Sequence, residues 1–318
     1  MATNYPTLTY LTSDPKFSDY RPTMNSAGDT VIFERTPVPP DGIPTTLQMI
    51  NDFSNPNPVP FLSGSPPASQ TRPDWCWATG NVLFNGAASN SNNSPISVWQ
   101  VGSDGTNPTV ISGTTGAYYP KWNLEGTQFV TENDAGSPSP CNTIFTLAGV
   151  PENANIDGVD ANNVSMFGGM PAVMATDLPQ IAYAGQPMVP NWSGPNTGNK
   201  YNENCNYIFL NLASGSSFVS HPVESGASIS SFDPKYEGRA PDVSPDGTMI
   251  VFESSRPNGG NSYAIYLLSL KDGSVKQVTK PGLNCQHAKF FPCGTKLILG
   301  AQNPTWNIAW VDISSLLA

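Results

Sequence analysis

The sequence contains few of the residues from which catalytic and metal centres are built. Only two histidines and five cysteines occur among 318 residues, and no two cysteines have the CxxC spacing of a structural zinc site. The motifs G-x-S-x-G, G-x-x-x-x-G-K and G-x-G-x-x-G are also missing. We therefore expect a protein that is not an enzyme and holds no cofactor. One alternative stays open, because a glycosidase-type pair of carboxylates leaves no local motif.

Charge is scarce as well, and most of it is negative. Charged residues make up 12% of the chain, the net charge is −10, and the 14 Lys and Arg residues are dispersed. Nucleic acids and anionic membrane surfaces attract clustered basic residues, so neither is an expected partner. Membrane insertion is not expected either, because no apolar run approaches the roughly 18 residues that a membrane span needs.

The N-terminal sequence leaves the compartment open. Met-Ala-Thr-Asn-Tyr-Pro lacks the basic and apolar regions of a signal peptide, so the chain as written is expected in the cytoplasm. The Lys-poor composition, rich in Asn, Ser and Thr, is more typical of a secreted or periplasmic protein whose signal was removed. The oligomeric state is left open too.

Turn-forming residues are abundant. The chain has 32 Pro and 28 Gly, together with 38% hydrophobic and 10% aromatic residues. Gly and Pro favour tight turns, and this much apolar surface supports a folded core rather than disorder. The composition therefore predicts a folded all-β protein with many short strands.

One sequence motif occurs six times. Each copy has a proline (alanine in the last), an apolar or aromatic residue two positions later, a turn, and a short apolar strand. The anchor positions are 22, 73, 120, 171, 241 and 288. Two further strand-like runs follow, such as 264–268 and 274–279. Four strands per unit of about 40–50 residues are typical of propeller blades. We predict a single six-bladed β-propeller with four antiparallel strands per blade.

The two ends of the chain complement each other. The sixth unit ends near Ile313 without a fourth strand, and residues 8–12 before the first unit resemble that strand. An N-terminal strand that completes the last blade would close the ring and remove its open edges. We expect one domain, 1–318, with blades over approximately 20–65, 71–116, 118–166, 169–225, 239–281 and 286–318 plus 5–13.

The fifth unit carries a family resemblance. Its segments Arg239–Gly247, Ile250–Arg256 and Ile265–Gly273, followed by Gln277–Thr279, resemble the TolB-type (PD40, WD40-like) propeller repeat. The resemblance implies a six-bladed propeller but no single ligand, since members bind proteins or sugars, gate peptidases or carry lyase sites. Two histidines do not supply the multi-histidine metal centre of the pectate-degrading lyases.

The residues just before the inner strands are expected to ring the mouth of the channel. They are Arg21, Arg72, Tyr119, Met170, Arg239 and His287. Three arginines in one ring would recognise a carboxylate, a phosphate or a chain end. The alternative is that each arginine pairs with a neighbouring carboxylate, namely Glu34, Asp74, Asp242 or Glu253.

Two long loops supply further candidates. They cover 185–202 and 220–238, are expected on the same rim, and carry Trp192, Tyr201, Asn202 and Tyr236 as possible ligand contacts. Trp75 and Trp122 occupy the apolar repeat position and are expected to pack between blades.

A weak calcium pattern occurs in the third unit. Asn153, Asn155, Asp157 and Asp160 have the spacing of a calcium loop, but Val164 stands where an acidic ligand is needed. A polar turn is the preferred interpretation.

These observations predict a non-catalytic binding propeller, with carbohydrate as the slightly favoured, lectin-like ligand because of the neutral, Trp-bearing loops. The alternative is a TolB-like adaptor for a protein or peptide, which the arginine ring favours. A polysaccharide-active enzyme is the second alternative, and two carboxylates about 5–10 Å apart in a pocket would indicate it. A purely structural protein is the third.

Overall fold

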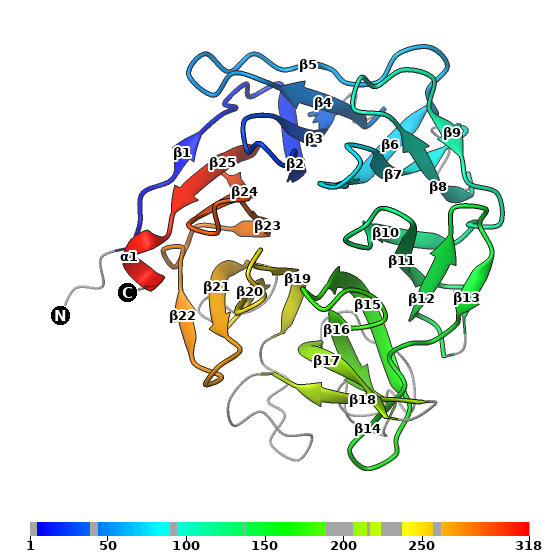
Figure 1. Ribbon diagram of the computed structural model, residues 1–318. Helices are drawn as coiled ribbons and strands as arrows, with labels where there is room; N and C mark the ends of the chain where they lie inside the picture. The colour runs from blue at the N-terminus through cyan, green and yellow to red at the C-terminus, as the bar shows by residue number, and fades with distance from the viewer. Residues whose placement is uncertain are drawn as a thin grey trace.

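The computed structural model describes residues 5–38, 44–89, 94–136, 138–188, 206–214, 217–223, 237–256 and 262–317. Six small sheets stand around a central channel (Figure 1). The chain is an all-β six-bladed propeller, as the repeat predicts. Its described helix, α1 (Ser314–Leu317), is one turn long, and no described helix is long and apolar enough to cross a membrane.

The strands of the first three blades run in sequence order from the channel outwards. Blade one contains β2 (Phe17–Met24), β3 (Val31–Pro37), β4 (Thr46–Ile50) and β5 (Val59–Pro60). Blade two contains β6 (Ser69–Trp75), β7 (Val82–Ala87), β8 (Ile96–Val101) and β9 (Thr109–Val110). Blade three contains β10 (Ala117–Trp122), β11 (Gln128–Asn133), β12 (Cys141–Thr146) and β13 (Pro151–Asn153).

The last three blades repeat this order with two variations. Blade four contains β15 (Met166–Val173), β16 (Ile181–Pro187), β17 (Tyr207–Ser214) and β18 (Ser217–Pro222). Blade five contains β19 (Gly238–Val243), β20 (Met249–Ser254), β21 (Ala264–Ser269) and β22 (Val275–Gln277). Blade six contains β23 (Cys285–Phe290), β24 (Lys296–Gln302) and β25 (Trp306–Asp312). Blade four differs from the expected four antiparallel strands, because β14 (Val159–Asp160) joins β18 as a fifth, parallel strand.

The N-terminus closes the ring, which confirms the prediction. Strand β1 (Thr9–Tyr10) pairs antiparallel with β25, opposite Trp310 and Ala309. Beyond this pairing, the backbone N–H of Leu11 donates to the carbonyl oxygen of Ile308 at 2.8 Å. The first residues described and the last blade therefore form a single sheet.

The core lies between the blades, because both faces of each central strand are covered. In β3 the consecutive residues Val31, Ile32 and Phe33 are all fully buried. A continuous apolar run is expected for a strand that is covered on both sides. Trp75 and Trp122 are buried in this inter-blade core, as the repeat pattern predicts.

Every inner strand contains a β-bulge at the anchor position. The register of β2 against β3 shifts between Tyr20 and Thr23, and the same shift occurs in the five other blades. The residue before each anchor has a φ angle between 46° and 52°. Residues other than glycine seldom adopt a positive φ angle. A bulge changes the direction in which a side chain points. The six bulges therefore determine which residues line the channel.

Candidate functional site

The bulges bring six residues together around the channel. They are Arg21, Arg72, Tyr119, Met170, Ala240 and His287. Five of them are the predicted ring residues. In blade five the prediction was wrong by one position, because the bulge precedes Pro241 and so selects Ala240. Arg239 lies in the regular ladder opposite Glu253 instead.

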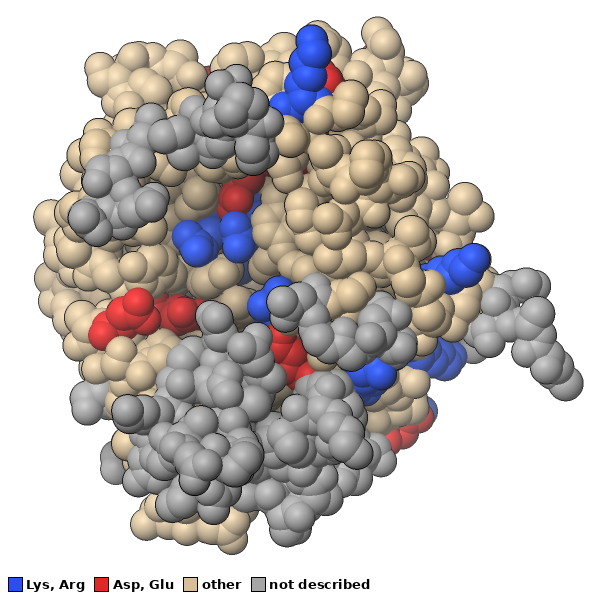
Figure 2. Space-filling view, turned by 180° about the vertical axis from the view of Figure 1, so that it is seen from behind, with Lys and Arg blue, Asp and Glu red and all other residues tan. Residues whose placement is uncertain are grey.

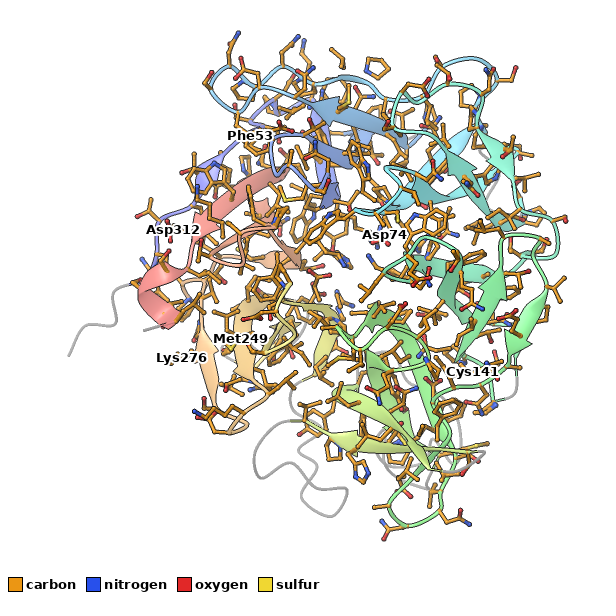
Figure 3. The ribbon with its side chains drawn as sticks, viewed as in Figure 1. Phe53, Asp74, Cys141, Met249, Lys276 and Asp312 are labelled. Atoms are coloured by element: carbon orange, nitrogen blue, oxygen red, sulfur yellow. The ribbon has the colours of Figure 1, made fainter. Side chains whose placement is uncertain are left out.

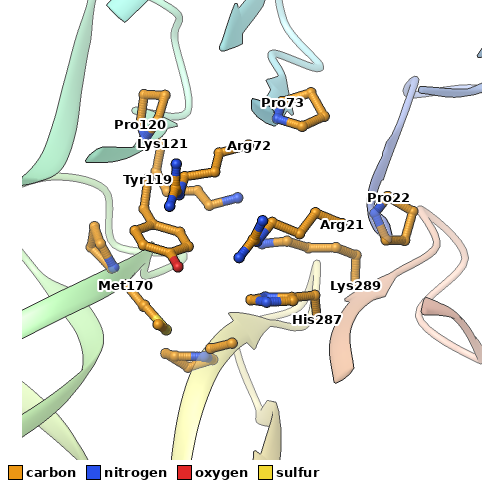
Figure 4. A pocket seen from close by; sticks show the side chains of 13 residues that line it. Arg21, Pro22, Arg72, Pro73, Tyr119, Pro120, Lys121, Met170, His287 and Lys289 are labelled. Atoms are coloured by element: carbon orange, nitrogen blue, oxygen red, sulfur yellow. The ribbon is translucent and has the colours of Figure 1, made fainter. Parts of the chain in front are cut away.

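A pocket lies within this ring (Figure 4). Its space amounts to about 440 Å³, including the part open to solvent. The lining consists of the six ring residues, Pro22, Pro73, Pro120, Pro171, Pro241, Lys121 and Lys289. It contains four basic side chains, two Arg and two Lys, but no carboxylate. An anion that enters the pocket would meet cations and apolar rings.

The backbone of the ring is held by side chains of the neighbouring blade. The N–H groups of Arg72 and His287 donate to Glu34 and Glu253 at 2.5 Å and 2.6 Å. Equivalent bonds join the N–H of Tyr119 to Asn85 and the N–H of Met170 to Glu132. In each case the acceptor belongs to the preceding blade along the chain. The acceptors occur at matching positions of the second strands.

This acceptor layer was not recognised from the sequence. Its signal is a polar residue after the apolar triplet of the second strand, as in Phe33-Glu34, Phe84-Asn85 and Phe252-Glu253. Three of the six blades show this signal. In blade three the acceptor Glu132 follows Thr131, and Ala184 and Gly300 take the same ladder position in blades four and six. Each acceptor satisfies a backbone donor that a strained bulge would otherwise leave unpaired.

Two arginines have carboxylate partners, as the alternative interpretation predicted. Arg21 Nη1 lies 3.0 Å from Glu34 Oε2, and Arg239 Nε lies 2.6 Å from Glu253 Oε1. Arg239 also donates to Gln286 Oε1 at 3.2 Å and lies over the ring of Tyr263. These contacts neutralise both guanidinium groups within the protein wall.

Arg72 is different. Its Nη1 donates to Thr71 Oγ1 at 3.2 Å, and its guanidinium lies 4.5 Å from the centroid of the Tyr119 ring. Among the described residues, no carboxylate oxygen lies within 4.0 Å of it, whereas its buried Nε lacks a hydrogen-bond acceptor just as that of Arg21 does. Glu132 and Asp134 act on it only over a longer range. The ring therefore contains one guanidinium whose charge lacks a direct partner.

The proposed pairing of arginine with Asp74 and Asp242 was wrong, because both aspartates bind lysines. Lys121 Nζ lies 2.6 Å from Asp74 Oδ1, and Lys289 Nζ lies 2.7 Å from Asp242 Oδ1. Each pair joins two adjacent blades, two and three or five and six. Asp74 lies beside the channel, whereas Lys276 lies toward the outer edge of the ring (Figure 3).

His287 is held as a neutral imidazole. It is 8% exposed, stacks on Tyr119 with ring centroids 6.4 Å apart, and forms a T-shaped contact with Tyr20 at a centroid distance of 4.8 Å. Burial, followed by the charges of Arg21 and other cations, holds its pKa well below the usual range. At neutral pH this side chain contributes hydrogen-bonding capacity but no charge.

A buried acid lies behind the ring. The Glu132 carboxylate accepts the Met170 N–H at 3.1 Å. Burial, and next the nearby Asp134 carboxylate, raise the pKa of Glu132 to about 7. A Cβ on Gly169 would lie 2.1 Å from Glu132 Oε2, so a larger residue here would displace the Glu132 carboxyl group.

The remaining candidates are separate from the ring. Asp157 is buried and accepts bonds from the backbone and side chain of Asn142, while Asp160 accepts the N–H groups of Asn162 and Val164. Both aspartates of the calcium pattern therefore form hydrogen bonds within the protein. The other two members of the pattern, Asn153 in β13 and Asn155 in the turn that follows, are exposed or half-exposed.

The loop candidates Trp192, Tyr201, Asn202 and Tyr236 lie outside the described residues. Their predicted contact with a ligand stays a prediction.

The face seen from behind is hollowed at its centre (Figure 2). Lys and Arg atoms are visible at the bottom of the hollow, and Asp and Glu atoms lie at its edges. A protein with a net charge of −10 therefore presents basic groups at the centre of this face.

The fold and the ring define a six-bladed β-propeller with a basic channel mouth. No family model and no curated protein matches the sequence. Among solved structures, the chain is similar to TolB from Acinetobacter baumannii, with 14% identity and a TM-score of 0.52 over 93% of this chain and 63% of that one. The chain thus spans less than two thirds of that protein.

Two further solved structures are similar to the chain. A putative TolB from Agrobacterium tumefaciens has 13% identity and a TM-score of 0.52 over 81% of this chain and 79% of that one. An oligogalacturonate lyase in complex with manganese has 10% identity and a TM-score of 0.58 over 100% and 96%. The architecture is TolB-like, and at these identities the likeness concerns the fold alone.

Proposed function

We propose that this chain is a non-catalytic binding protein whose channel mouth holds a carboxylate group of a peptide or protein partner. The observation that carries the proposal is Arg72, a ring guanidinium without a carboxylate within 4.0 Å among the described residues. The two other arginines considered, Arg21 and Arg239, have such partners. Arg72 is therefore the group whose charge is available to a ligand.

The surroundings of Arg72 strengthen binding of an anion. A guanidinium presents a planar fork of donors that matches a carboxylate. The prolines and Tyr119 exclude water from one side, and charge-assisted hydrogen bonds are stronger where water is scarce. Since the described lining contains no Asp or Glu, a bound carboxylate would meet no like charge.

Binding rather than catalysis is supported by the chemistry of the lining. It offers no Ser or Cys nucleophile and no Asp or Glu carboxylate. Among the residues that the structure describes, no three His, Cys, Asp or Glu side chains form a group suited to a metal. The pair of carboxylates in a pocket that would favour a glycosidase is not found in this lining.

A peptide or protein is preferred over a carbohydrate as the ligand. The carbohydrate prediction depended on Trp192 and its loop, which lie outside the described residues. The adaptor alternative depended on the arginine ring, of which Arg72 is available. The solved neighbours include both TolB and a lyase named for oligogalacturonate, so acidic sugars belong in the test.

Labelled protein would be applied to an array of acidic peptides and glycans, oligogalacturonate among them, at 50 and 300 mM NaCl. We expect binding to acidic peptides that weakens with salt and falls at least 10-fold in Arg72→Gln. Lys271→Gln, an equal loss of charge in an exposed turn of blade five, serves as the control.

The proposal is wrong if Arg72→Gln binds as strongly as the wild-type protein, or if the wild-type protein binds no acidic peptide. Binding to oligogalacturonate alone would show that the ligand is an acidic carbohydrate and not a peptide.

A further inference from the structure

A layer of ion pairs crosses the channel next to the ring. Lys121 with Asp74 and Lys289 with Asp242 come from opposite sides of the propeller. All four side chains are at most one fifth exposed. The two lysine side chains extend into the centre of the channel from these opposite sides (Figure 4).

This layer is fastened to the blades. The second oxygen of Asp74 accepts the N–H of Trp122 at 2.9 Å, and that of Asp242 accepts the N–H of Phe290 at 2.9 Å. Removing one member would leave a buried charge without its partner, which is strongly destabilising. The layer is therefore expected to stay in place, and a chain that enters from the ring would stop at it.

The walls above the layer are mainly apolar. Five prolines, Ala240, Met170 and the ring of Tyr119 line the pocket around Arg72. A ligand that fits would present apolar surface and one carboxylate side by side. The side chain of an internal Asp or Glu supplies the carboxylate alone, whereas the last residue of a polypeptide supplies both.

The geometry points to a blind pocket for the C-terminal residue of a partner polypeptide. Its α-carboxylate binds Arg72, its apolar side chain packs against Tyr119, Met170 and the prolines, and the Lys–Asp layer excludes a continuing chain. Capture of a chain end by oriented donors is a known mode of peptide recognition. This inference rests on the proposed function and specifies which carboxylate the site recognises.

The test uses a peptide array with three matched forms of each sequence. One form ends in an apolar residue with a free carboxylate, the second is its C-terminal amide, and the third is an amide with an internal Glu. We expect the free-carboxylate form to bind at least 10-fold more tightly than both amides, and Arg72→Gln to abolish the difference. Equal binding of the internal-Glu amide would overturn the chain-end assignment and leave carboxylate binding intact. Binding of none of the three forms would refute both proposals.

A second variant tests the Lys–Asp layer. Asp74→Asn with Lys121→Ala removes one ion pair at constant net charge and keeps an oxygen for the Trp122 N–H. We expect this variant to lose at least half of its preference for free over amidated ends, because a longer chain now passes the layer. An unchanged preference in a variant with the wild-type circular dichroism spectrum would show that the layer does not limit the pocket.

Discussion

Six residues next to the anchors hold a backbone conformation that L-amino acids seldom adopt. Positive φ at a residue such as Arg72 or Tyr119 costs on the order of 1–2 kcal/mol. The N–H groups of Arg72 and Tyr119 donate hydrogen bonds to Glu34 and Asn85, and these bonds offset part of the cost. The side chains that line the channel are thus oriented by a strained backbone conformation. Hydrogen-bond acceptors of the neighbouring blade stabilise this conformation.

Glu132 makes stability depend on pH. Its pKa is about 7 in the folded protein and near 4.5 when unfolded, so the folded state binds the proton more tightly. This contribution is complete below about pH 4.5 and is lost as the pH rises to about 7. Chemical unfolding between pH 5 and 8 should show a falling stability, and Glu132→Gln should reduce the fall by up to about 3 kcal/mol.

Asp157 remains in that variant and keeps part of the slope, because burial raises its pKa to about 7 as well. Asp272→Asn is the control, since hydrogen bonds to Ser274 lower the pKa of this exposed group to about 2, outside the range measured. Identical slopes for Glu132→Gln and the wild-type protein would contradict the assignment.

The candidate site was predictable where it follows the repeat. Five ring residues were predicted correctly from their place before the inner strand, but in blade five Arg239 was taken although Ala240 directly precedes the anchor proline. The lysines of the channel layer gave no signal, because Lys121 binds Asp74 of another blade and only the folded ring brings them together. Sequence spacing reports neighbours along the chain, not across blades.

At the scale of strands, the sequence was most informative where the apolar pattern is regular. The fifth unit, with Val251 and Phe252 fully buried in β20, contains the expected four strands. The long spacing around the fourth unit gave no indication of β14, whose two residues pair in parallel with β18. Strands this short have no periodicity to detect.

The aromatic residue of an inner strand should contribute strongly to stability. Trp122 ends β10, is 5% exposed and packs with Cys76, Leu83 and Phe129 of two blades. Trp122→Ala should lower the free energy of unfolding by about 3–5 kcal/mol, measured by urea denaturation. Trp77 is 40% exposed and makes one hydrogen bond, to Met24, so Trp77→Ala should cost only about 1 kcal/mol. A smaller loss in Trp122→Ala than in Trp77→Ala would contradict this account.

For the whole molecule, closure by the N-terminal strand affects all blades. Leu11 is 4% exposed and packs with Met24 of blade one and Phe291 of blade six. Removing residues 1–12 would expose this core and leave β25 without its outer neighbour.

We expect the truncated protein to unfold in one transition at a melting temperature at least about 3 °C lower, because burial of Leu11 alone contributes about 2–3 kcal/mol. Differential scanning calorimetry measures both the temperature and the number of transitions. A truncated ring with unchanged melting would show that the terminal pairing does not hold the blades together.

The Lys–Asp layer also has a consequence for ancestry. In chain order, the residues one position after the anchors are Thr23, Asp74 and Lys121, then Ala172, Asp242 and Lys289. The order Asp, Lys thus returns after half a turn, with a small residue before it each time. Duplication of a gene for three blades would produce this order. In such an ancestor, two identical chains facing each other across a dyad would have built both ion pairs from a single Asp and a single Lys.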